Sequence, residues 1–223
     1  MIALAPREAY RLWAPTYATE TAISFIDEEL TTALSPPLAN KRLLDAGCGI
    51  GRRMACSEAA LSIGVDASPE MLAASKAKSV AAADVRALPF ADRQFDIVWC
   101  RLVLGHLSDP TPAYREMGRV CSPEGHLLVT DFHVDAVAAG HRRSFRDGTG
   151  AVHEVEHHTH DGAIHQAAAE RAGFTMLARR DGIIGASVED FYIRAGRLQL
   201  YERDKGLAVV AVYLFRRVDR CAF

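Results

Sequence analysis

The 223-residue sequence predicts an α/β fold with a mostly parallel sheet, and three observations lead to this prediction. Short apolar runs alternate with stretches of helical periodicity, which is the pattern of strand–helix–strand units. The first apolar run ends at Asp45 and is followed by a glycine-rich turn, Gly47-Cys48-Gly49-Ile50-Gly51. The next apolar run ends in a second acid, Asp66. A strand followed by a glycine turn is typical of nucleotide-binding α/β proteins, so we expect a ligand at the carboxyl ends of the strands.

The individual elements follow from the hydrophobic period and from capping signals. Residues 7–34 carry two helical stripes, broken near Pro15 and ended by Ser35-Pro36-Pro37. Predicted strands cover residues 42–45, 61–66, 79–83, 95–101, 126–132, 174–184 and 208–216. Predicted helices run from the glycine turn to residue 60, from Pro69 behind its cap Ser68, and over residues 110–120, 161–172 and 188–205. Residues 133–160 are rich in His, Arg and Gly and have little helical period.

The spacing of the glycines distinguishes between two kinds of cofactor. Dinucleotide-binding folds use G-x-G-x-x-G, and their helix N-terminus faces a pyrophosphate. Here the spacing is G-x-G-x-G, and Asp45 precedes it. A carboxylate at this point would repel a pyrophosphate but suits a ligand with an ammonium group. Asp66, about 20 residues further on, stands where a ribose hydroxyl pair is held. S-adenosylmethionine has an ammonium, a sulfonium and a ribose, and it fits this pattern.

Four segments together resemble the class I S-adenosylmethionine-dependent methyltransferases. LLDAGCGIGR resembles their first motif, and SIGVDASPEML resembles their second. ADVRALPFADRQFDIVWC is similar to the stretch with the adenine contact and the fourth strand, and EMGRVCSPEGHLLVTDF to the helix and fifth strand. The matches run in order over residues 40–132. The general resemblance is to the ubiquinone/biotin-biosynthesis type, which methylates carbon, oxygen or nitrogen atoms of small molecules.

The resemblance implies a Rossmann-like, seven-stranded, mostly parallel sheet with an antiparallel last hairpin and helices on both faces. We expect a single domain over residues 1–223. Its parts would be an N-terminal helical cover (1–38), a cofactor-binding core (39–132), a lid or acceptor segment after strand five (133–160) and the C-terminal part of the core (161–223).

The resemblance also implies a set of cofactor-binding residues. Asp45 would face the methionine ammonium, Arg52 would pair with the methionine carboxylate, and Asp66 would accept from both ribose hydroxyls. The full set is Tyr17, Asp45, Gly47, Cys48, Gly49, Gly51, Arg52, Asp66, Ala67, Met71, Asp84, Val85 and Arg101. In this set Ala67 and Met71 would line the adenine, and Asp84 and the Val85 N–H would bind its edge. Arg101 follows strand four, where the transferable methyl group should lie, and Tyr17 lies on the N-terminal cover.

A carbon or oxygen acceptor also needs its proton removed, and histidine is the natural base near neutral pH. The candidates are His157, His133 and His106, in that order, because lid histidines most often reach acceptors. Cys100-Arg101-Leu102-Val103 differs from the Asp/Asn-Pro-Pro-Tyr motif of nucleic-acid base methylation, and no metal-binding set of the catechol type is present. We therefore expect a small diffusible acceptor, with anionic and phenolic molecules as the first classes to test.

The segment HEVEHHTHDGAIH contains the zinc-protease pattern H-E-x-x-H at residues 153–157. That pattern requires a helix, whereas the glycines before it and the β-branched residues within it favour an extended form. We therefore predict a hairpin or lid over the active site, with no metal as a cofactor. The alternative is a solvated, histidine-rich loop. Arg142, Arg143 and Arg146 precede it, and they would either attract an anionic acceptor or form a solvated face.

Composition limits the partners and the compartment. The net charge of −2 without a basic stripe argues against nucleic acid, and no apolar run has the length of a membrane span. The five cysteines, Cys48, Cys56, Cys100, Cys121 and Cys221, are dispersed, as in a reduced cytoplasmic protein. A monomer and a homodimer both remain open. So do two alternatives to methyl transfer: a non-methylating enzyme that uses the same cofactor, and a protein that only senses it.

Overall fold

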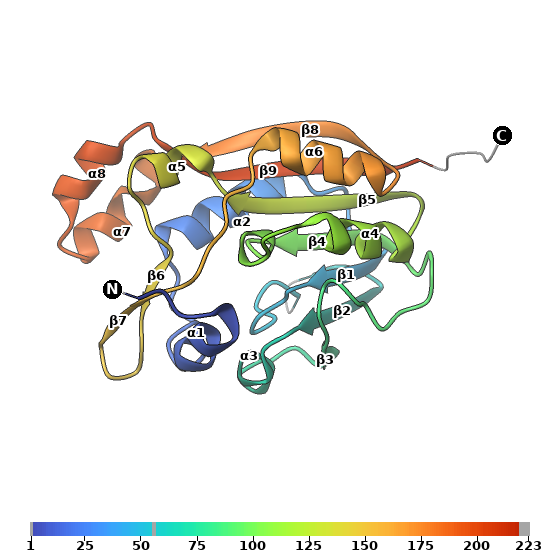
Figure 1. Cartoon of the computed structure of the whole chain (residues 1–223), viewed down its shortest axis with the longest axis horizontal. Helices are drawn as coiled ribbons and strands as arrows, with labels where there is room; N and C mark the ends of the chain where they lie inside the picture. The colour runs from blue at the N-terminus through green and yellow to red at the C-terminus, as the bar shows by residue number, and fades with distance from the viewer. Residues whose placement is uncertain (1, 55–56, 219–223) are drawn as a thin grey trace.

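The computed structural model of the protein describes residues 2–54 and 57–218. Its centre is a seven-stranded sheet in the order β3-β2-β1-β4-β5-β9-β8 (Figure 1). The strands are β1 (Arg42–Ala46), β2 (Leu61–Asp66), β3 (Val80–Ala82), β4 (Phe95–Arg101), β5 (Cys121–Phe132), β8 (Phe174–Ile183) and β9 (Ala208–Arg217). β1 to β5 pair in parallel, and β9 runs antiparallel to both β5 and β8. The predicted mostly parallel sheet with an antiparallel last hairpin is confirmed.

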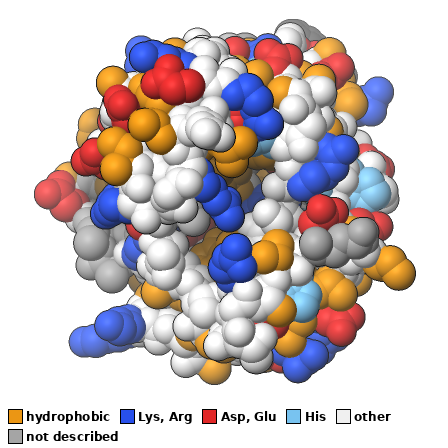
Figure 2. Space-filling view, turned by 90° about the vertical axis from the view of Figure 1, so that its left-hand side faces the viewer, with side chains coloured by type: hydrophobic (Ala, Val, Ile, Leu, Met, Phe, Trp, Pro, Cys, Tyr) orange, Lys and Arg blue, Asp and Glu red, His pale blue; other side chains and the backbone are white. Residues whose placement is uncertain are grey.

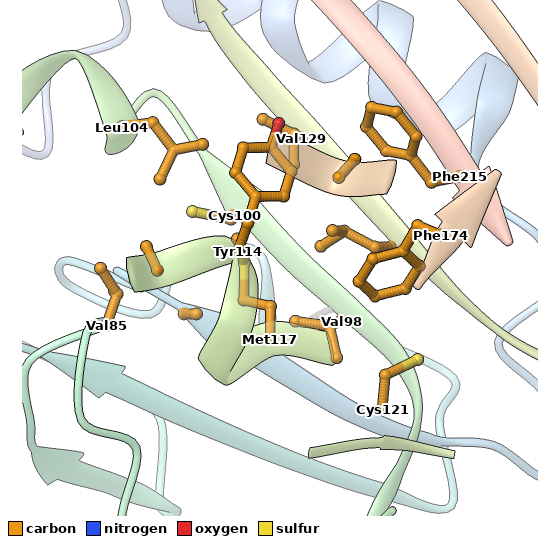
Figure 3. Close-up of a cluster of buried hydrophobic side chains, with 14 of the residues drawn as sticks. Val85, Val98, Cys100, Leu104, Tyr114, Met117, Cys121, Val129, Phe174 and Phe215 are labelled. Carbon is orange, nitrogen blue, oxygen red and sulfur yellow. The ribbon is translucent and has the colours of Figure 1, made fainter. Parts of the chain in front are cut away.

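Helices cover both faces of the sheet. Leu30 and Leu34 of α2 (Ala22–Leu34) pack on one face, against a cluster that includes Leu43 and Trp99. On the other face, α4 (Thr111–Val120) and α6 (Gly162–Arg171) contribute Tyr114, Met117, Ala168 and Ala169 to the largest buried cluster. Figure 3 shows Tyr114 and Met117 next to the strand residues Val98 and Val129, with Phe174 and Phe215 in the same cluster. The same apolar alternation that predicted the strands therefore forms the core.

Helices begin behind side-chain caps at Thr21, Ser68 and Asp161, and one of these caps, Ser68, was predicted. Thr21 and Ser24 form a reciprocal capping box at the start of α2. The Ser68 hydroxyl accepts from the Met71 N–H at the start of α3 (Pro69–Ala73). The Asp161 carboxylate accepts from the Ile164 N–H at the start of α6. The N-terminal section is also divided as predicted, since α1 (Pro6–Trp13) ends before Pro15.

Two predicted helices are wrong in detail. Between β1 and β2 the described residues contain no α-helix, because Gly51 has a φ of +65° and successive N–H groups bond three residues back, from Gly51 to Cys48 and from Met54 to Gly51. Over residues 188–205 the prediction was one helix. The structure has α7 (Glu189–Arg194) and α8 (Leu198–Asp204), separated at Gly196, whose φ of +65° interrupts the helical backbone.

Residues 139–160, called the hairpin segment below, follow α5 (Val134–Ala138). They contain the antiparallel strands β6 (Ser144–Arg146) and β7 (Val152–Glu154). Leu4 pairs with the end of the hairpin at Val155, so α1 and the hairpin segment form one layer beside the glycine turn. Figure 1 shows this layer, with β6 and β7 beside α1 and apart from the main sheet. The 153–157 stretch is extended here and not helical, as predicted.

The described residues also bear on disulfide bonds, membrane spans and metal sites. Cys48, Cys100 and Cys121 are free thiols, while Cys56 and Cys221 lie outside the described residues. No helix within residues 2–54 and 57–218 is long and apolar enough to cross a membrane. Over the same ranges, no three His, Cys, Asp or Glu side chains are grouped closely enough to hold a metal ion.

Candidate functional site

The glycine turn folds tightly against β2. Gly47, Gly49 and Gly51 all have positive φ angles, of +89°, +55° and +65°. The N–H groups of Gly47 and Cys48 both donate to the Val65 carbonyl, at 2.7 and 2.9 Å. A Cβ at Gly47 would come within 2.2 Å of a Val103 methyl group, so no larger residue fits there. Because the glycines have no side chains, the turn exposes backbone atoms to the space at the carboxyl ends of the strands.

A cavity of about 620 Å³ adjoins this turn and the end of β2. That volume lies in the usual range for a small-molecule ligand. Its lining brings together seven of the predicted cofactor residues that are distant in sequence: Tyr17, Gly47, Gly49, Asp66, Ala67, Met71 and Val85. Asp84 and Arg101 also line it, which makes nine of the predicted residues in all. We call this the nucleoside cavity.

Asp66 is anchored at the floor of the nucleoside cavity. One carboxylate oxygen accepts from the Gly49 N–H and the other from the Ser68 N–H, both at 2.8 Å. Burial raises the pKa of Asp66, while these backbone bonds oppose the rise. Asp84 is more exposed and forms a two-pronged ion pair with Arg86, which lowers the pKa of Asp84. Of the two acids, Asp66 is therefore the more rigidly placed.

A second cavity, of about 220 Å³, lies on the other side of the turn. We call it the hairpin cavity. It is lined by Asp45, Cys48 and Arg52 from the turn and by Arg142, Arg143 and Ser144 from the hairpin segment. Asp45 is 4% exposed, and burial raises the pKa of Asp45 to about 6. Figure 2 shows a hollowed side of the molecule with Lys and Arg side chains around the hollow.

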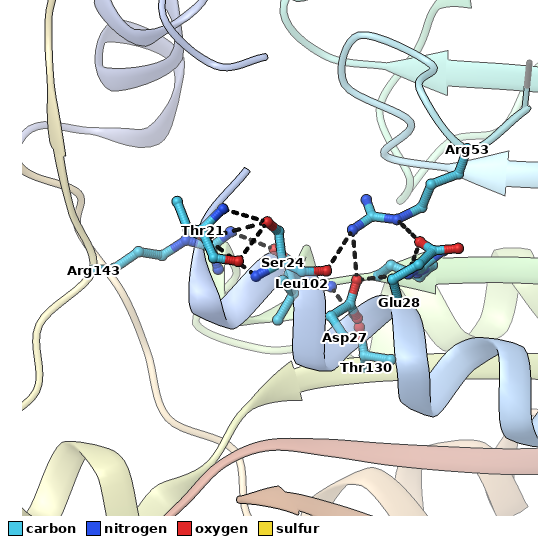
Figure 4. Close-up of polar contacts among 9 residues, drawn as sticks. Thr21, Ser24, Asp27, Glu28, Arg53, Leu102, Thr130 and Arg143 are labelled. Atoms are coloured by element: carbon cyan, nitrogen blue, oxygen red, sulfur yellow. Dashed lines mark hydrogen bonds and ion pairs between the residues drawn. The ribbon is translucent and has the colours of Figure 1, made fainter. Parts of the chain in front are cut away.

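Arg101 was predicted to contact the cofactor. In the structure, its guanidinium forms ion pairs with two acids of α2. Its Nη2 lies 2.7 Å from Asp27 and 2.9 Å from Glu28. Arg53 pairs with the same two acids, at 2.9 and 2.5 Å (Figure 4). Two cations and two anions thus join α2, the glycine turn and β4 behind the cavities. Asp27 could not be identified from the sequence, since an acid within an amphipathic helix usually faces solvent.

Tyr10 is the centre of a second polar group. Its hydroxyl lies 2.9 Å from Nε2 of His106 and accepts from Nη2 of Arg143 at 3.0 Å. The other ring nitrogen of His106 lies 3.4 Å from the Glu156 carbonyl. Burial lowers the pKa of His106 well below its ordinary value, so the ring is neutral near pH 7. Tyr10 and His106 both line the nucleoside cavity.

The other two predicted bases lie outside the lining of both cavities. His133 caps α5, where its Nδ1 accepts from the Asp135 N–H. His157 is 3.9 Å from Asp131 and packs edge-on against His106, with the ring centres 6.2 Å apart. Burial lowers the pKa of His157 to about 4. Of the three histidines, His106 alone is brought to the ligand space.

Comparison with known proteins relates the chain to one group. A family model described as "Methyltransferase domain" matches residues 44–129. The 27-O-demethylrifamycin SV methyltransferase of Amycolatopsis mediterranei is 27% identical, over 82% of each chain. The malonyl-[acyl-carrier protein] O-methyltransferase of Erwinia billingiae is 30% identical over 58% of this chain, which spans 54% of that relative's length. An S-adenosylmethionine-dependent methyltransferase from Mesorhizobium loti has a similar fold, with a TM-score of 0.67 and 21% identity over 86% of this chain and 98% of that one.

Proposed function

Because the chain belongs to the class I S-adenosylmethionine-dependent methyltransferases, we propose that it methylates a small organic acceptor. The acceptor would bind in the hairpin cavity, next to the methionine part of the cofactor at Asp45 and Arg52. The observation that carries this proposal is the junction of the two cavities. Tyr17, Gly47, Arg101 and Leu102 line both of them, so a ligand in one cavity meets a ligand in the other at the end of β4. Ligands of open α/β sheets bind at the carboxyl ends of the strands, where this junction lies.

The residues present fit the cofactor. Asp66 keeps lone pairs for a ribose hydroxyl pair, since each oxygen uses one acceptor site on the backbone. Met71 and Val85 offer apolar walls for the adenine. A buried carboxylate with a raised pKa, Asp45, is stabilised by a neighbouring ammonium group. When bound, S-adenosylmethionine supplies an electrophilic methyl group and is converted to S-adenosylhomocysteine.

The hairpin segment would act as the lid over the acceptor. It is fixed to α1 through Leu4 and reaches the cavity with Arg143 and Ser144. Trp13 of α1 stacks on Phe145 at 4.8 Å, which closes the outer side of this layer. A closed layer excludes water, and it also holds the acceptor in line with the methyl group.

The proton of an oxygen acceptor would leave through Tyr10 and His106. In the neutral ring, the Nδ1–H of His106 donates to Glu156, and Nε2 accepts from the Tyr10 hydroxyl. As the acceptor oxygen forms its bond to the methyl carbon, its proton passes to the Tyr10 oxygen while the phenolic proton passes to His106. The neutral imidazole has the free electron pair that this transfer requires.

Ligand binding followed by turnover tests the proposal. We expect S-adenosylhomocysteine to bind the wild-type protein in calorimetric titration and to bind Asp66→Asn at least tenfold more weakly, because a charged acceptor of two hydrogen bonds is lost. The control is Asp190→Asn, at an exposed position of α7. Turnover is measured as S-adenosylhomocysteine released with panels of small acceptors. If neither S-adenosylmethionine nor S-adenosylhomocysteine binds, the proposed function is wrong.

A further inference from the structure

Arg143 is a cation of the hairpin cavity without an ion-pair partner among the described residues. Arg143 is partly buried and lines the cavity. Its Nη2 donates to the Tyr10 hydroxyl and to the Leu102 carbonyl, at 3.0 and 2.9 Å, and both of these acceptors are neutral. Within residues 2–54 and 57–218, no carboxylate lies within 4.0 Å of Arg143, and its Nε and Nη1 have no hydrogen-bond partner. Figure 4 shows the side chain reaching from the hairpin segment toward Leu102.

The neighbouring charges do not neutralise it. Arg53 and Arg101 share Asp27 and Glu28, so those four charges balance among themselves. Asp45 is the acid in the cavity lining, and the proposed function uses it for an ammonium group. Asp131 also acts electrostatically on Arg143, but it forms no ion pair with it. A desolvated guanidinium is costly unless it is paired. The hairpin cavity therefore has a net positive charge at Arg143, which contacts Tyr10 where the nucleoside cavity adjoins.

From this arrangement we propose that Arg143 binds an anionic group, a carboxylate or a phosphate, on the methyl acceptor. The inference rests on the proposed function and adds the substrate class. A guanidinium fork matches the geometry of either anion with two parallel hydrogen bonds, and Nε and Nη1 of Arg143 are available for them. Arg142 also lines the cavity, so the approach to Arg143 is itself positive.

The position of Arg143 also limits where the anion lies on the acceptor. Arg143 and His106 contact the same phenolic oxygen of Tyr10, from two sides. An anion held by Arg143 therefore lies within a few bonds of the atom whose proton reaches Tyr10. We expect acceptors such as hydroxy acids or phenols with a neighbouring carboxylate or phosphate, not long molecules with a remote charge.

The competing assignment is that Arg143 binds the methionine carboxylate of the cofactor. Arg52 is the alternative for that role, because it lies on the glycine turn in the same cavity and its Nε is buried without a partner. The two assignments differ in which ligand loses affinity when Arg143 is changed. An acceptor role leaves S-adenosylhomocysteine binding intact, whereas a cofactor role does not.

The test is calorimetric titration of the protein saturated with S-adenosylhomocysteine. The probes are salicylate, benzoate and succinate, each paired with its neutral amide, together with phenyl phosphate. We expect at least one acid to bind about tenfold or more tightly than its amide, and Arg143→Gln to remove this preference while changing the affinity for S-adenosylhomocysteine less than twofold. Phenyl phosphate against benzoate separates a phosphate site from a carboxylate site.

Two variants control for folding and for general charge. Arg143→Lys keeps the charge and should retain part of the preference. Arg146→Gln removes an exposed arginine of the same hairpin, whose Nη1 bonds only the Gly150 carbonyl among the described residues, and should leave the preference unchanged. The inference is overturned if no acid binds more tightly than its amide, if Arg143→Gln keeps the preference, or if Arg143→Gln abolishes S-adenosylhomocysteine binding. Absence of S-adenosylhomocysteine binding in the wild type would instead refute the proposed function.

Discussion

The buried carboxylate of Asp45 should make ligand binding depend on pH. Its folded-state pKa is raised to about 6 by burial, above the value in an unfolded chain. For the unliganded protein, the stability contributed by this group is present below about pH 4 and is lost as the pH rises through about 6. An ammonium group beside Asp45 favours the ionised form, so ligand binding should strengthen over the same interval.

We therefore expect S-adenosylhomocysteine to bind about tenfold more weakly at pH 5 than at pH 7, because the site must first lose its proton. Asp45→Asn should bind more weakly at pH 7 and should show a much flatter pH profile. Calorimetric titration at several pH values measures both effects. Equal pH profiles for the wild type and Asp45→Asn would show that Asp45 does not face the ammonium.

His106 gives a second prediction at the scale of one residue. Burial is the main cause of its lowered pKa, and the charge of Arg143 is the next. The ring should remain neutral at pH 6, and Arg143→Gln should raise the pKa of His106 toward its ordinary value. Histidine titration followed by NMR measures this directly, with Arg143→Lys as the charge-preserving control. An unchanged His106 titration in Arg143→Gln would contradict the arrangement around Tyr10.

At the scale of elements, a small apolar cluster that includes Ala9, Phe145 and Val155 holds the hairpin segment on α1. Phe145 is 5% exposed and stacks on Trp13 on one side and on His153 on the other. Removing this ring should cost about 3 kcal/mol locally, since it leaves a cavity between α1 and the hairpin. We expect Phe145→Ala to speed amide exchange over residues 141–158 while β1 and β4 stay protected.

Hydrogen exchange with mass spectrometry checks this prediction, and Phe191→Ala is the matched control. Phe191 lies on α7, where it packs near Phe25 and away from the hairpin. That variant should leave exchange of the hairpin segment unchanged. Uniform acceleration over the whole chain in Phe145→Ala would show that the hairpin segment does not open as a separate unit.

Elements whose signals are local were predictable from sequence, and those decided by tertiary contacts were not. The start of α3 was predicted from its cap Ser68, because capping depends on a few neighbouring residues. No α-helix follows β1 in the described residues because Gly51 has a positive φ angle. The sequence pattern alone does not determine that angle. The glycine turn and Asp66 were placed together because parallel strand ends meet at one edge. The inward direction of Arg143 was not predictable, since Arg142 and Arg146 beside it have the same local pattern.

At the scale of the whole molecule, the strand order places distant residues around one junction. β1 lies between β2 and β4, so Asp45, Asp66 and Arg101 end side by side at one edge of the sheet. α1 and the hairpin segment cover that edge from segments about 130 residues apart, which the bond between Tyr10 and Arg143 joins. Ligand binding and stability should therefore be coupled, because both depend on the same packed layers.

The buried ion network is the strongest test of this coupling. Asp27 and Arg101 have side-chain exposures of 0% and 2%, and they join α2 to the end of β4. Asp27→Ala leaves Arg101 buried beside Glu28 alone and should lower the free energy of unfolding by about 3–5 kcal/mol, because an uncompensated buried charge is expensive. Removing both charges in Asp27→Leu with Arg101→Met should recover most of that loss, since apolar replacements of a buried pair are tolerated.

Urea unfolding of the single and double variants measures these differences, and Arg86→Ala provides the surface control. The pair of Arg86 with Asp84 has side-chain exposures of 53% and 40%, so its loss should cost less than about 1 kcal/mol. A double variant as unstable as Asp27→Ala would mean that the network contributes more than charge compensation. Because Arg101 also lines both cavities, the double variant should bind S-adenosylhomocysteine more weakly even when its stability is restored. Weaker binding at restored stability would show that Arg101 contributes to the ligand site as well as to the packed layers.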